Sequence, residues 1–172
     1  MIISETLRLR QSKALAKKVA RYVGDDRERF GTLMQLIFDN DQVIAPRAAW
    51  AMNTCVEKYP HLVKPYLKKM IAQLKRTDMH PGVTRNIVRI LQYVDVPENL
   101  LGTLTNTCYD LMLDPASPIA VKAFTMTVLL NICKREPELK NELKVAIAAV
   151  LENSTAATRS RAKHTLMALD KL

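Results

Sequence analysis

Residues 41–52, DQVIAPRAAWAM, begin with an aspartate in a turn, pass through small residues and a proline, and reach an arginine inside a helical pattern. The same order returns in DMHPGVTRNIVRIL at 78–91, DPASPIAVKAFTMTVL at 114–129 and NSTAATRSRAKHTLMAL at 153–169. The basic residues of these segments follow one another at steps of 38, 37 and 39 positions: Arg47, Arg85, Lys122 and Arg161. A unit of about 38 residues, repeated along the chain, is the most specific signal in the sequence.

A second set of positions keeps this period in the following helices. Ile71, Cys108 and Ile147 are separated by 37 and 39 residues. The same two steps separate a further row: Leu74, Leu111 and Val150. Two independent rows with one period are hard to obtain by chance, so we expect stacked helical hairpins, each of which buries its apolar face against the next.

Apolar residues at three- and four-residue spacing predict nine helices. Their ranges are 4–22, 27–38, 43–58, 62–76, 82–94, 98–113, 118–134, 138–152 and 156–170. No segment alternates strictly, so no strand is predicted. Prolines are expected at helix starts, where no amide donor is needed, at Pro97, Pro118 and Pro137. Turn or capping residues are expected at Asp41, Asp78, Asp114 and Asn153.

Length and composition suit a folded helical protein. The chain has 172 residues, enough for one domain or two small ones, with 48% hydrophobic and 25% charged residues. Only four glycines are present, beside one tryptophan, five tyrosines and three phenylalanines. An all-β fold and a glycine-loop nucleotide binder are therefore unlikely from composition. The formal net charge of +9 makes the chain basic.

The segment RAAWAM at 47–52, preceded by an Asp-containing turn, resembles the first helix of HEAT repeats, and a two-helix unit of about forty residues is typical of the HEAT and armadillo class. The resemblance covers about residues 41–170 and fits 4–38 loosely. Lys122 replaces the usual arginine, and Asn86 and Ile87 stand where small residues are usual.

The resemblance implies an all-α fold, a right-handed α–α superhelix of about four to four and a half HEAT-like hairpins. We expect one α-solenoid domain over 1–172. Its hairpins are predicted at about 4–38, 41–76, 78–113 and 114–152, with a terminal helix over 154–172.

The second helix of each hairpin lines the concave surface in such a stack, as the resemblance implies. Residues 60–77 carry five basic residues and no acid. The concave surface is then predicted to present Lys64, Lys68, Lys75, Asn99, Thr103, Asn106, Asp110, Lys140 and Lys144. This surface is basic at one end and polar in the middle, which suits an acidic protein segment or a phosphate backbone, with salt-sensitive affinity in either case.

Motifs for chemistry are missing from the sequence. The three histidines, His61, His80 and His164, have neither HxxxH nor HExxH spacing, and no Cys/His pair has zinc-site spacing. The acidic cluster Asp25, Asp26 and Glu28 is explained by a helix start. We therefore expect no catalytic residue, no metal site and no cofactor.

The sequence is consistent with two functions. The first is a non-enzymatic scaffold that binds a protein or peptide on the concave helices. The alternative is a nucleic-acid-binding or DNA-repair-related protein that uses the basic N-terminal helix and residues 60–77. Some bacterial alkylpurine DNA glycosylases are HEAT-like solenoids, but no Trp-rich cleft appears in this chain, and its aromatic residues are equally at home in helix packing: Trp50, Tyr59, Tyr66, Tyr93 and Tyr109. A metabolic enzyme is a distant third.

The cysteines indicate the compartment. Cys55, Cys108 and Cys133 are an odd set without a CxxC pair, each among apolar neighbours, so we expect core packing and a cytoplasmic location. No apolar run is long enough to span a bilayer, so no membrane partner is expected. The N-terminus faintly resembles a transit peptide, but a structural helix is favoured. The chain is expected to be a monomer, or a dimer through a terminal hairpin with an apolar end at Leu166, Met167, Leu169 and Leu172.

Overall fold

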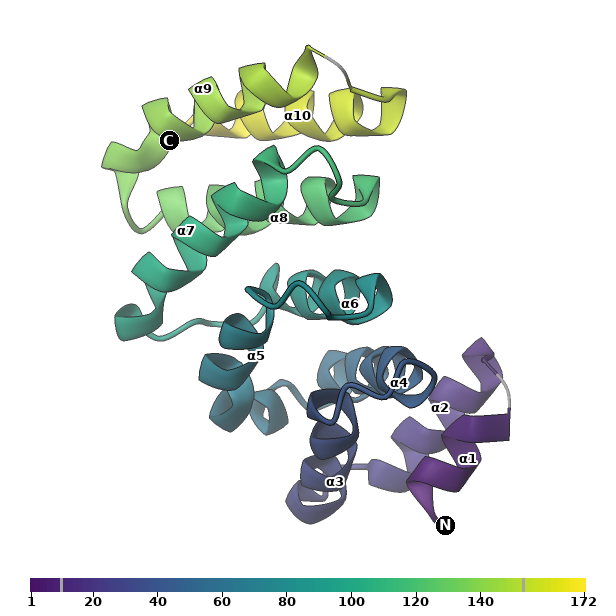
Figure 1. Cartoon of the computed structure of the whole chain (residues 1–172). Helices are drawn as coiled ribbons and strands as arrows, with labels where there is room; N and C mark the ends of the chain where they lie inside the picture. Colours follow the sequence, from purple (N-terminus) through teal and green to yellow (C-terminus); the bar gives the residue numbers. More distant parts are fainter. Residues whose placement is uncertain (10, 153) are drawn as a thin grey trace. The chain divides into compact units, whose positions relative to one another are not determined.

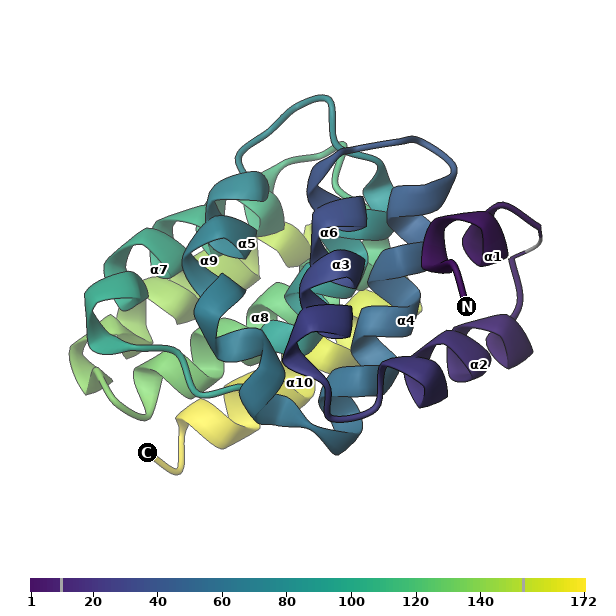
Figure 2. The same cartoon turned by 90° about the horizontal axis from the view of Figure 1, so that it is seen from below.

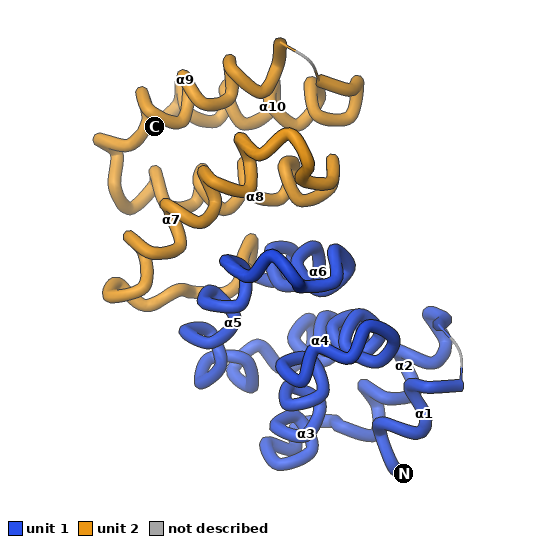
Figure 3. The backbone as a smooth tube through the Cα atoms, in the orientation of Figure 1, with its two compact units in different colours: residues 1–90 blue, residues 91–172 orange. Residues whose placement is uncertain are grey.

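The computed structural model describes residues 1–9, 11–152 and 154–172. Within these ranges the chain forms ten α-helices and two short 3-10 helices, without a β-strand (Figure 1). The prediction of an all-α fold is confirmed. The helices group into two compact units, residues 1–90 (unit 1) and residues 91–172 (unit 2), which Figure 3 colours separately. The single domain over 1–172 stays a prediction.

Unit 1 is organised around one long helix. Its helices are α1 (Ile3–Leu9), α2 (Lys13–Val23), α3 (Arg27–Phe38), α4 (Ile44–Lys58), the 3-10 helix η1 (Pro60–Tyr66), α5 (Leu67–Gln73) and α6 (Pro81–Leu91), whose last residue already belongs to unit 2. The central helix α4 packs against α1, α2, α3 and η1 (Figure 2). Its small residues Ala45, Ala48, Ala49 and Ala51 are fully buried, which lets these neighbours approach closely.

The predicted helix over 4–22 is wrong in one respect, because it is two helices. α1 ends at Leu9 and α2 begins at Lys13. Ser12 has an extended backbone (φ −155°, ψ 153°), and its hydroxyl accepts a hydrogen bond from the amide of Leu15 at 3.1 Å. A serine in this conformation satisfies a free amide of the following helix and so starts it. The apolar spacing continues across the break, which is why the sequence predicted one helix.

The predicted helix over 62–76 also differs in the structure. Residues Pro60–Tyr66 form a 3-10 helix, and the α-helix proper covers only Leu67–Gln73. Pro65 lies inside the first part. Proline has no amide hydrogen, and its ring clashes with the carbonyl four residues earlier, so α-helical geometry is disfavoured there. The fifth predicted helix, 82–94, is also shorter, since α6 covers Pro81–Leu91.

The turn residues fulfil their predicted roles unevenly. Asp41 caps α4, since its Oδ1 accepts the amides of Val43 and Ile44, each at 2.8 Å. Asp78 instead faces the preceding turn, where Arg76 Nε donates to its Oδ1 at 2.8 Å. His80 satisfies an amide in the first turn of α6, because its Nδ1 accepts a hydrogen bond from the amide of Gly82 at 2.9 Å. The predicted role of Asn153 lies outside the described residues.

Unit 2 contains α7 (Glu98–Leu113), α8 (Ile119–Cys133), the 3-10 helix η2 (Pro137–Leu139), α9 (Lys140–Leu151) and α10 (Ala156–Leu169). Helix α8 packs against α7, α9 and α10 and is the centre of this unit (Figures 1 and 2). Pro97 and Pro118 directly precede α7 and α8, and Pro137 opens η2. The predicted proline positions at helix starts are therefore confirmed.

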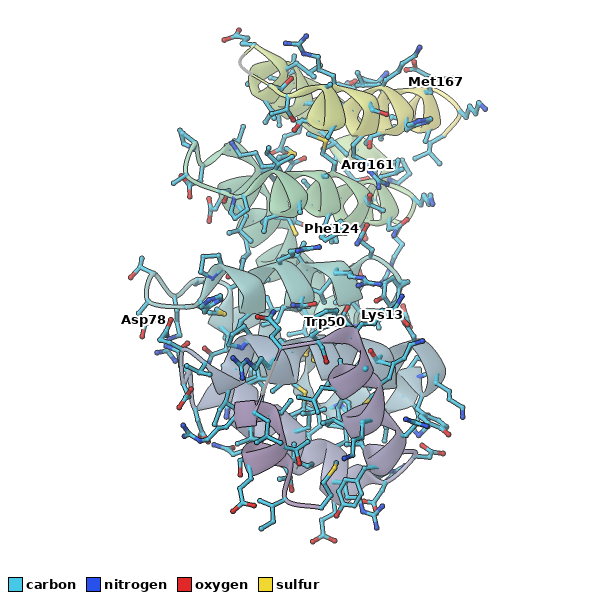
Figure 4. The ribbon with its side chains drawn as sticks, turned by 90° about the vertical axis from the view of Figure 1, so that its right-hand side faces the viewer. Lys13, Trp50, Asp78, Phe124, Arg161 and Met167 are labelled. Carbon is cyan, nitrogen blue, oxygen red and sulfur yellow. The ribbon has the colours of Figure 1, made fainter. Side chains whose placement is uncertain are left out.

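Of the two repeated rows, the first is buried throughout, whereas in the second Leu74 is buried but Leu111 and Val150 are only half-buried. Ile71 is 1% exposed, and Cys108 and Ile147 are fully buried. The basic row lies near the edges of the first helices. Arg47 Nη1 donates to the carbonyls of Leu7 and Arg8, and Arg161, labelled in Figure 4, donates to Thr127 Oγ1 at 3.2 Å. The basic residues at 47 and 161 therefore connect α4 to α1 and α10 to α8.

Candidate partner-binding surface

The basic segment 60–77 separates into paired and unpaired cations. Lys69 Nζ lies 4.1 Å from the centre of the Phe38 ring. The guanidinium of Arg76 binds Asp78, which lowers the pKa of that carboxyl, first through the hydrogen bond and then through the charge. Arg76 is therefore matched by a carboxylate, and Lys69 is exposed but rests over an aromatic ring. Among the five basic residues of the segment, this leaves the three that the sequence analysis selected.

Lys64, Lys68 and Lys75 are exposed, and no carboxylate of the described chain lies within 4.0 Å of their amines. Lys64 belongs to η1, Lys68 to α5 and Lys75 to the turn that follows. The three lysines therefore come from three consecutive elements of one short segment. We call these three residues the η1–α5 lysines.

A hollow of about 370 Å³ lies beside Lys64, lined by Arg27, His61, Leu62, Lys64, Pro65 and Tyr66. Its ring Tyr66 is fixed by packing, with its centre 5.8 Å from Phe30 and 6.4 Å from Phe38. The close approach of Tyr66 to α3 needs Gly31, where a Cβ atom would lie 3.0 Å from the tyrosine hydroxyl. The His61 Nε2 lies 2.7 Å from Asp25 Oδ1. The lining of the hollow therefore combines one packed ring, Tyr66, with two cationic side chains, Arg27 and Lys64.

The predicted polar residues of the middle hairpin share one face of α7. Asn99, Thr103, Asn106 and Asp110 are all exposed, and their spacing of four, three and four places them on one side of the helix. Between them lie buried residues such as Leu101 and Leu104. The four polar residues therefore form an exposed polar face of α7, and that this face lies on a concave surface stays a prediction.

The two predicted lysines of α9 are less available. Lys140 and Lys144 are half-buried. Lys144 Nζ lies 2.6 Å from Asp170 Oδ1, so its charge is matched within unit 2. A sequence pattern could not show this pair, because Asp170 follows α10, 26 residues later.

The nine predicted residues divide between the units. The η1–α5 lysines lie in unit 1, and the six residues of α7 and α9 lie in unit 2. One surface that contains all nine stays a prediction. The three lysines are the part of it with a defined local geometry.

The η1–α5 lysines offer positive charge and hydrogen-bond donors to a partner. No cluster of three or more histidine, cysteine, aspartate and glutamate residues that could hold a metal occurs in the described part of the chain. The three cysteines are buried and unpaired, as predicted. Burial raises the pKa of Cys55 and of Cys108 to about 12, so both thiols stay protonated near neutral pH. Protonated, buried thiols are poor nucleophiles.

Sequence reasoning missed a cavity of about 510 Å³ between α2 and α4. Three of its wall residues are Lys17, Arg21 and Lys58, which come from two different helices. The spacing of Lys17 and Arg21, four residues apart on a predicted helix, was a usable signal. Lys58 reaches the same cavity only because α2 packs against α4, and hydrophobic periodicity does not predict which helices pack together.

Comparison with known proteins gives one match. A family model described as a HEAT repeat domain matches residues 3–169. Neither a curated protein nor a solved structure matches the chain. In the described ranges, no helix combines the length and the apolar character that a membrane crossing requires.

Proposed function

Because the chain belongs to the HEAT repeat family, whose repeats generally serve as protein-interaction scaffolds, we propose that it is a non-enzymatic scaffold that binds an acidic protein segment. The η1–α5 lysines are the observation that carries this proposal. They are exposed cations without a matching carboxylate in the described chain, whereas Lys69 and Arg76 of the same segment are engaged.

The geometry suits an acidic peptide that lies along η1 and α5. Carboxylates of the partner would meet Lys64 on η1, Lys68 near the start of α5 and Lys75 just after its end. The hollow beside Lys64 is large enough for one side chain, and Arg27 adds a second cation at its edge. Exposed ion pairs are weakened by salt, since charges are screened over about 8 Å at physiological ionic strength.

Beside the η1–α5 lysines, packing of the nearest ring favours a protein partner over a nucleic acid, although Tyr93 in unit 2 is 50% exposed. Single-strand binders stack bases on accessible rings beside a basic groove. Tyr66, the ring nearest to the η1–α5 lysines in sequence, packs against Phe30 and Phe38. Tyr109 is only 9% exposed. Neither ring is free for a base, so nucleic acid is kept as an outcome of the test.

The test uses the full chain and two kinds of probe. A fluorescent peptide of alternating glutamate and alanine represents an acidic partner, and short single- and double-stranded DNA and RNA represent the alternative. Lys64→Glu combined with Lys68→Glu should weaken peptide binding at least about ten-fold, which corresponds to about 1.4 kcal/mol. Circular dichroism should report an unchanged helical content, since exposed substitutions cost little stability.

The matched control is Lys163→Glu combined with Lys171→Glu, two exposed lysines of unit 2. It changes the net charge by the same amount, so its affinity should stay within about three-fold of the parent chain. Equal losses in the two double variants would reduce the effect to net charge and overturn the proposed surface. Nucleic acids that bind at low salt, while the acidic peptide does not, would replace the proposal with the nucleic-acid alternative.

The proposal includes a cytoplasmic location and either a monomer or a dimer through the terminal hairpin. Three buried, unpaired cysteines suit a reducing cytoplasm. A dimer through the terminal hairpin would cover the apolar side chains at the end of α10, where Met167 is 51% and Leu172 47% exposed. Sedimentation at several protein concentrations distinguishes this dimer from the monomer.

A further inference from the structure

The cavity between α2 and α4 is separate from the η1–α5 lysines and has its own chemistry. Helices α2 and α4 lie side by side in unit 1 (Figures 1 and 2). The cavity of about 510 Å³ is lined by Lys17, Ala20, Arg21, Gly24, Thr54, Cys55, Lys58 and Tyr59. Its volume lies within the range of about 300–1,000 Å³ that is usual for small-molecule sites.

The charged residues that line the α2–α4 cavity are all positive. Lys17, Arg21 and Lys58 are exposed, and no carboxylate belongs to the lining. Within the described chain no carboxylate lies within 4.0 Å of these three cationic groups. Three like charges around one cavity repel one another, and an anion in the cavity would relieve this repulsion. The guanidinium of Arg21 can also bind two oxygens of one oxyanion.

The floor of the cavity is apolar. Ala20 is 8% and Cys55 is 1% exposed. Tyr59 also lines the cavity, and Lys58 Nζ lies 5.2 Å from the centre of the Tyr59 ring. Because burial raises the pKa of Cys55 to about 12, its thiol is an uncharged part of the floor. The cavity therefore combines a cationic rim with a surface that suits an aromatic or aliphatic group.

Helix-end electrostatics account for only part of this arrangement. Arg21 and Lys58 lie in the last turns of α2 and α4, where cations favour the negative end of the helix dipole. The terminal carbonyls already accept backbone amides, from Gly24 to Ala20 at 2.9 Å and from Tyr59 to Cys55 at 2.8 Å. Dipole compensation explains neither Lys17, which lies near the middle of α2, nor the hollow shared by the three cations.

We propose that the α2–α4 cavity binds a phosphate monoester with an apolar or aromatic body. The phosphate carries about −1.5 to −2 charges near neutral pH, which three cations can balance. Its oxygens would lie among Lys17, Arg21 and Lys58, and its body would cover Ala20 and Cys55. A free small ester and a phosphotyrosine side chain of another protein share this chemistry. Binding is non-covalent.

The test measures binding of inorganic phosphate, phenyl phosphate and a glycine-rich phosphotyrosyl peptide by calorimetry and by amide chemical shifts. Phenyl phosphate should bind at least about ten-fold more tightly than inorganic phosphate, because its ring adds buried apolar area. Tighter binding of the peptide than of phenyl phosphate would identify a protein source, and weaker binding a free ester. Equal affinities for phosphate and phenyl phosphate would overturn the proposal.

Neutral variants separate the cavity from general surface charge. Lys17→Gln, Arg21→Gln and Lys58→Gln together should reduce phenyl phosphate affinity at least about ten-fold. The control triple, Lys13→Gln, Lys18→Gln and Lys163→Gln, removes the same charge from exposed residues outside the lining; Lys13 is labelled in Figure 4. Equal losses in both triples would overturn the proposal. If the cavity triple does not fold, Arg21→Gln alone should lower the affinity about three-fold, and no loss would count against the site.

Discussion

Asn53 of α4 and Asn86 of α6 connect their helices through one amide group. Asn53 Nδ2 donates to the backbone carbonyl of Asn86 at 3.1 Å and to its side-chain oxygen at 3.0 Å. Asn53 is only 1% exposed. Asn86 is one of the two residues that depart from the small-residue pattern of the repeat, and this contact gives its side chain a structural role. A polar residue in one repeat is matched by a buried polar residue in the preceding one.

Replacing Asn53 should therefore be costly. Asn53→Ala removes the donor and leaves the side-chain oxygen of Asn86 without it, so we expect the free energy of unfolding to fall by about 1–2 kcal/mol. Urea unfolding of the single and double variants with Asn86→Ala measures the coupling, expected at about 0.5 kcal/mol or more. Asn106→Ala, on the exposed face of α7, is the control. Additive losses from the two single variants would show that the contact contributes nothing.

Ile71 tests the inward-facing row of the repeat. Ile71→Ala should lower the free energy of unfolding by about 2–5 kcal/mol, because a cavity replaces a fully packed side chain. Ile71→Val should cost about 0.5–1.5 kcal/mol. The matched control is Val145→Ala on α9, where Val145 is 72% exposed and the change should stay within about 0.5 kcal/mol. An effect of Ile71→Ala no larger than the control would contradict the assignment of this row to the core.

The carboxylate of Asp41 should make the free energy of unfolding depend on pH. Hydrogen bonds from the amides of Ile44 and Val43 lower the pKa of its carboxyl below the ordinary 3.8, with a smaller contribution from Arg8. A lowered pKa in the folded state stabilises the fold above the unfolded-state pKa, and this contribution is lost as the pH falls through the folded-state value. The stability difference between the parent chain and Asp41→Ala should be constant above about pH 5 and shrink below about pH 4.

Urea unfolding at a series of pH values measures this difference. Asp114→Ala is not a suitable control, because the Asp114 carboxylate also accepts an amide, from Ala116 at 2.9 Å. Glu152→Ala, an exposed carboxylate after α9, should show a flat difference instead. A difference for Asp41→Ala that does not change between pH 5 and pH 2 would exclude the capping contribution.

The cysteines should be protected from thiol reagents. Burial is the first cause of the raised pKa of Cys55, Cys108 and Cys133, and all three are buried and unpaired. We expect slow reaction of the native chain with Ellman's reagent at pH 8 and rapid release of three equivalents in concentrated urea. Rapid reaction of one equivalent in the native chain would show that one of these thiols is accessible.

The period of about 38 residues predicted the repeated helices because the stack buries the same positions in every unit. Ile71, Cys108 and Ile147 are core residues for this reason. Helix starts were also predictable where a single residue decides them, as Pro118 does for α8. Local rules of this kind act within a few residues and can therefore be recognised in the sequence.

Features that depend on distant residues were not predictable in the same way. The pairing of Lys144 with Asp170 and the cavity of α2 and α4 arise from packing between helices. The break at Ser12 was missed although its capping signal is local, because the apolar spacing continues through it. The predicted binding role of Lys64, Lys68 and Lys75 stays a prediction, and the 3-10 helix that holds Lys64 was not predictable from the apolar spacing.

Helix α1 depends on a residue that is synthesised much later. It has only seven residues, too few for a stable isolated helix, and its terminal carbonyls at Leu7 and Arg8 are bound by Arg47, about forty positions downstream. On the ribosome, the first turns of the chain therefore emerge before the arginine that holds them. Residues Ile3–Leu9 can therefore adopt their native contacts only after α4 has been synthesised.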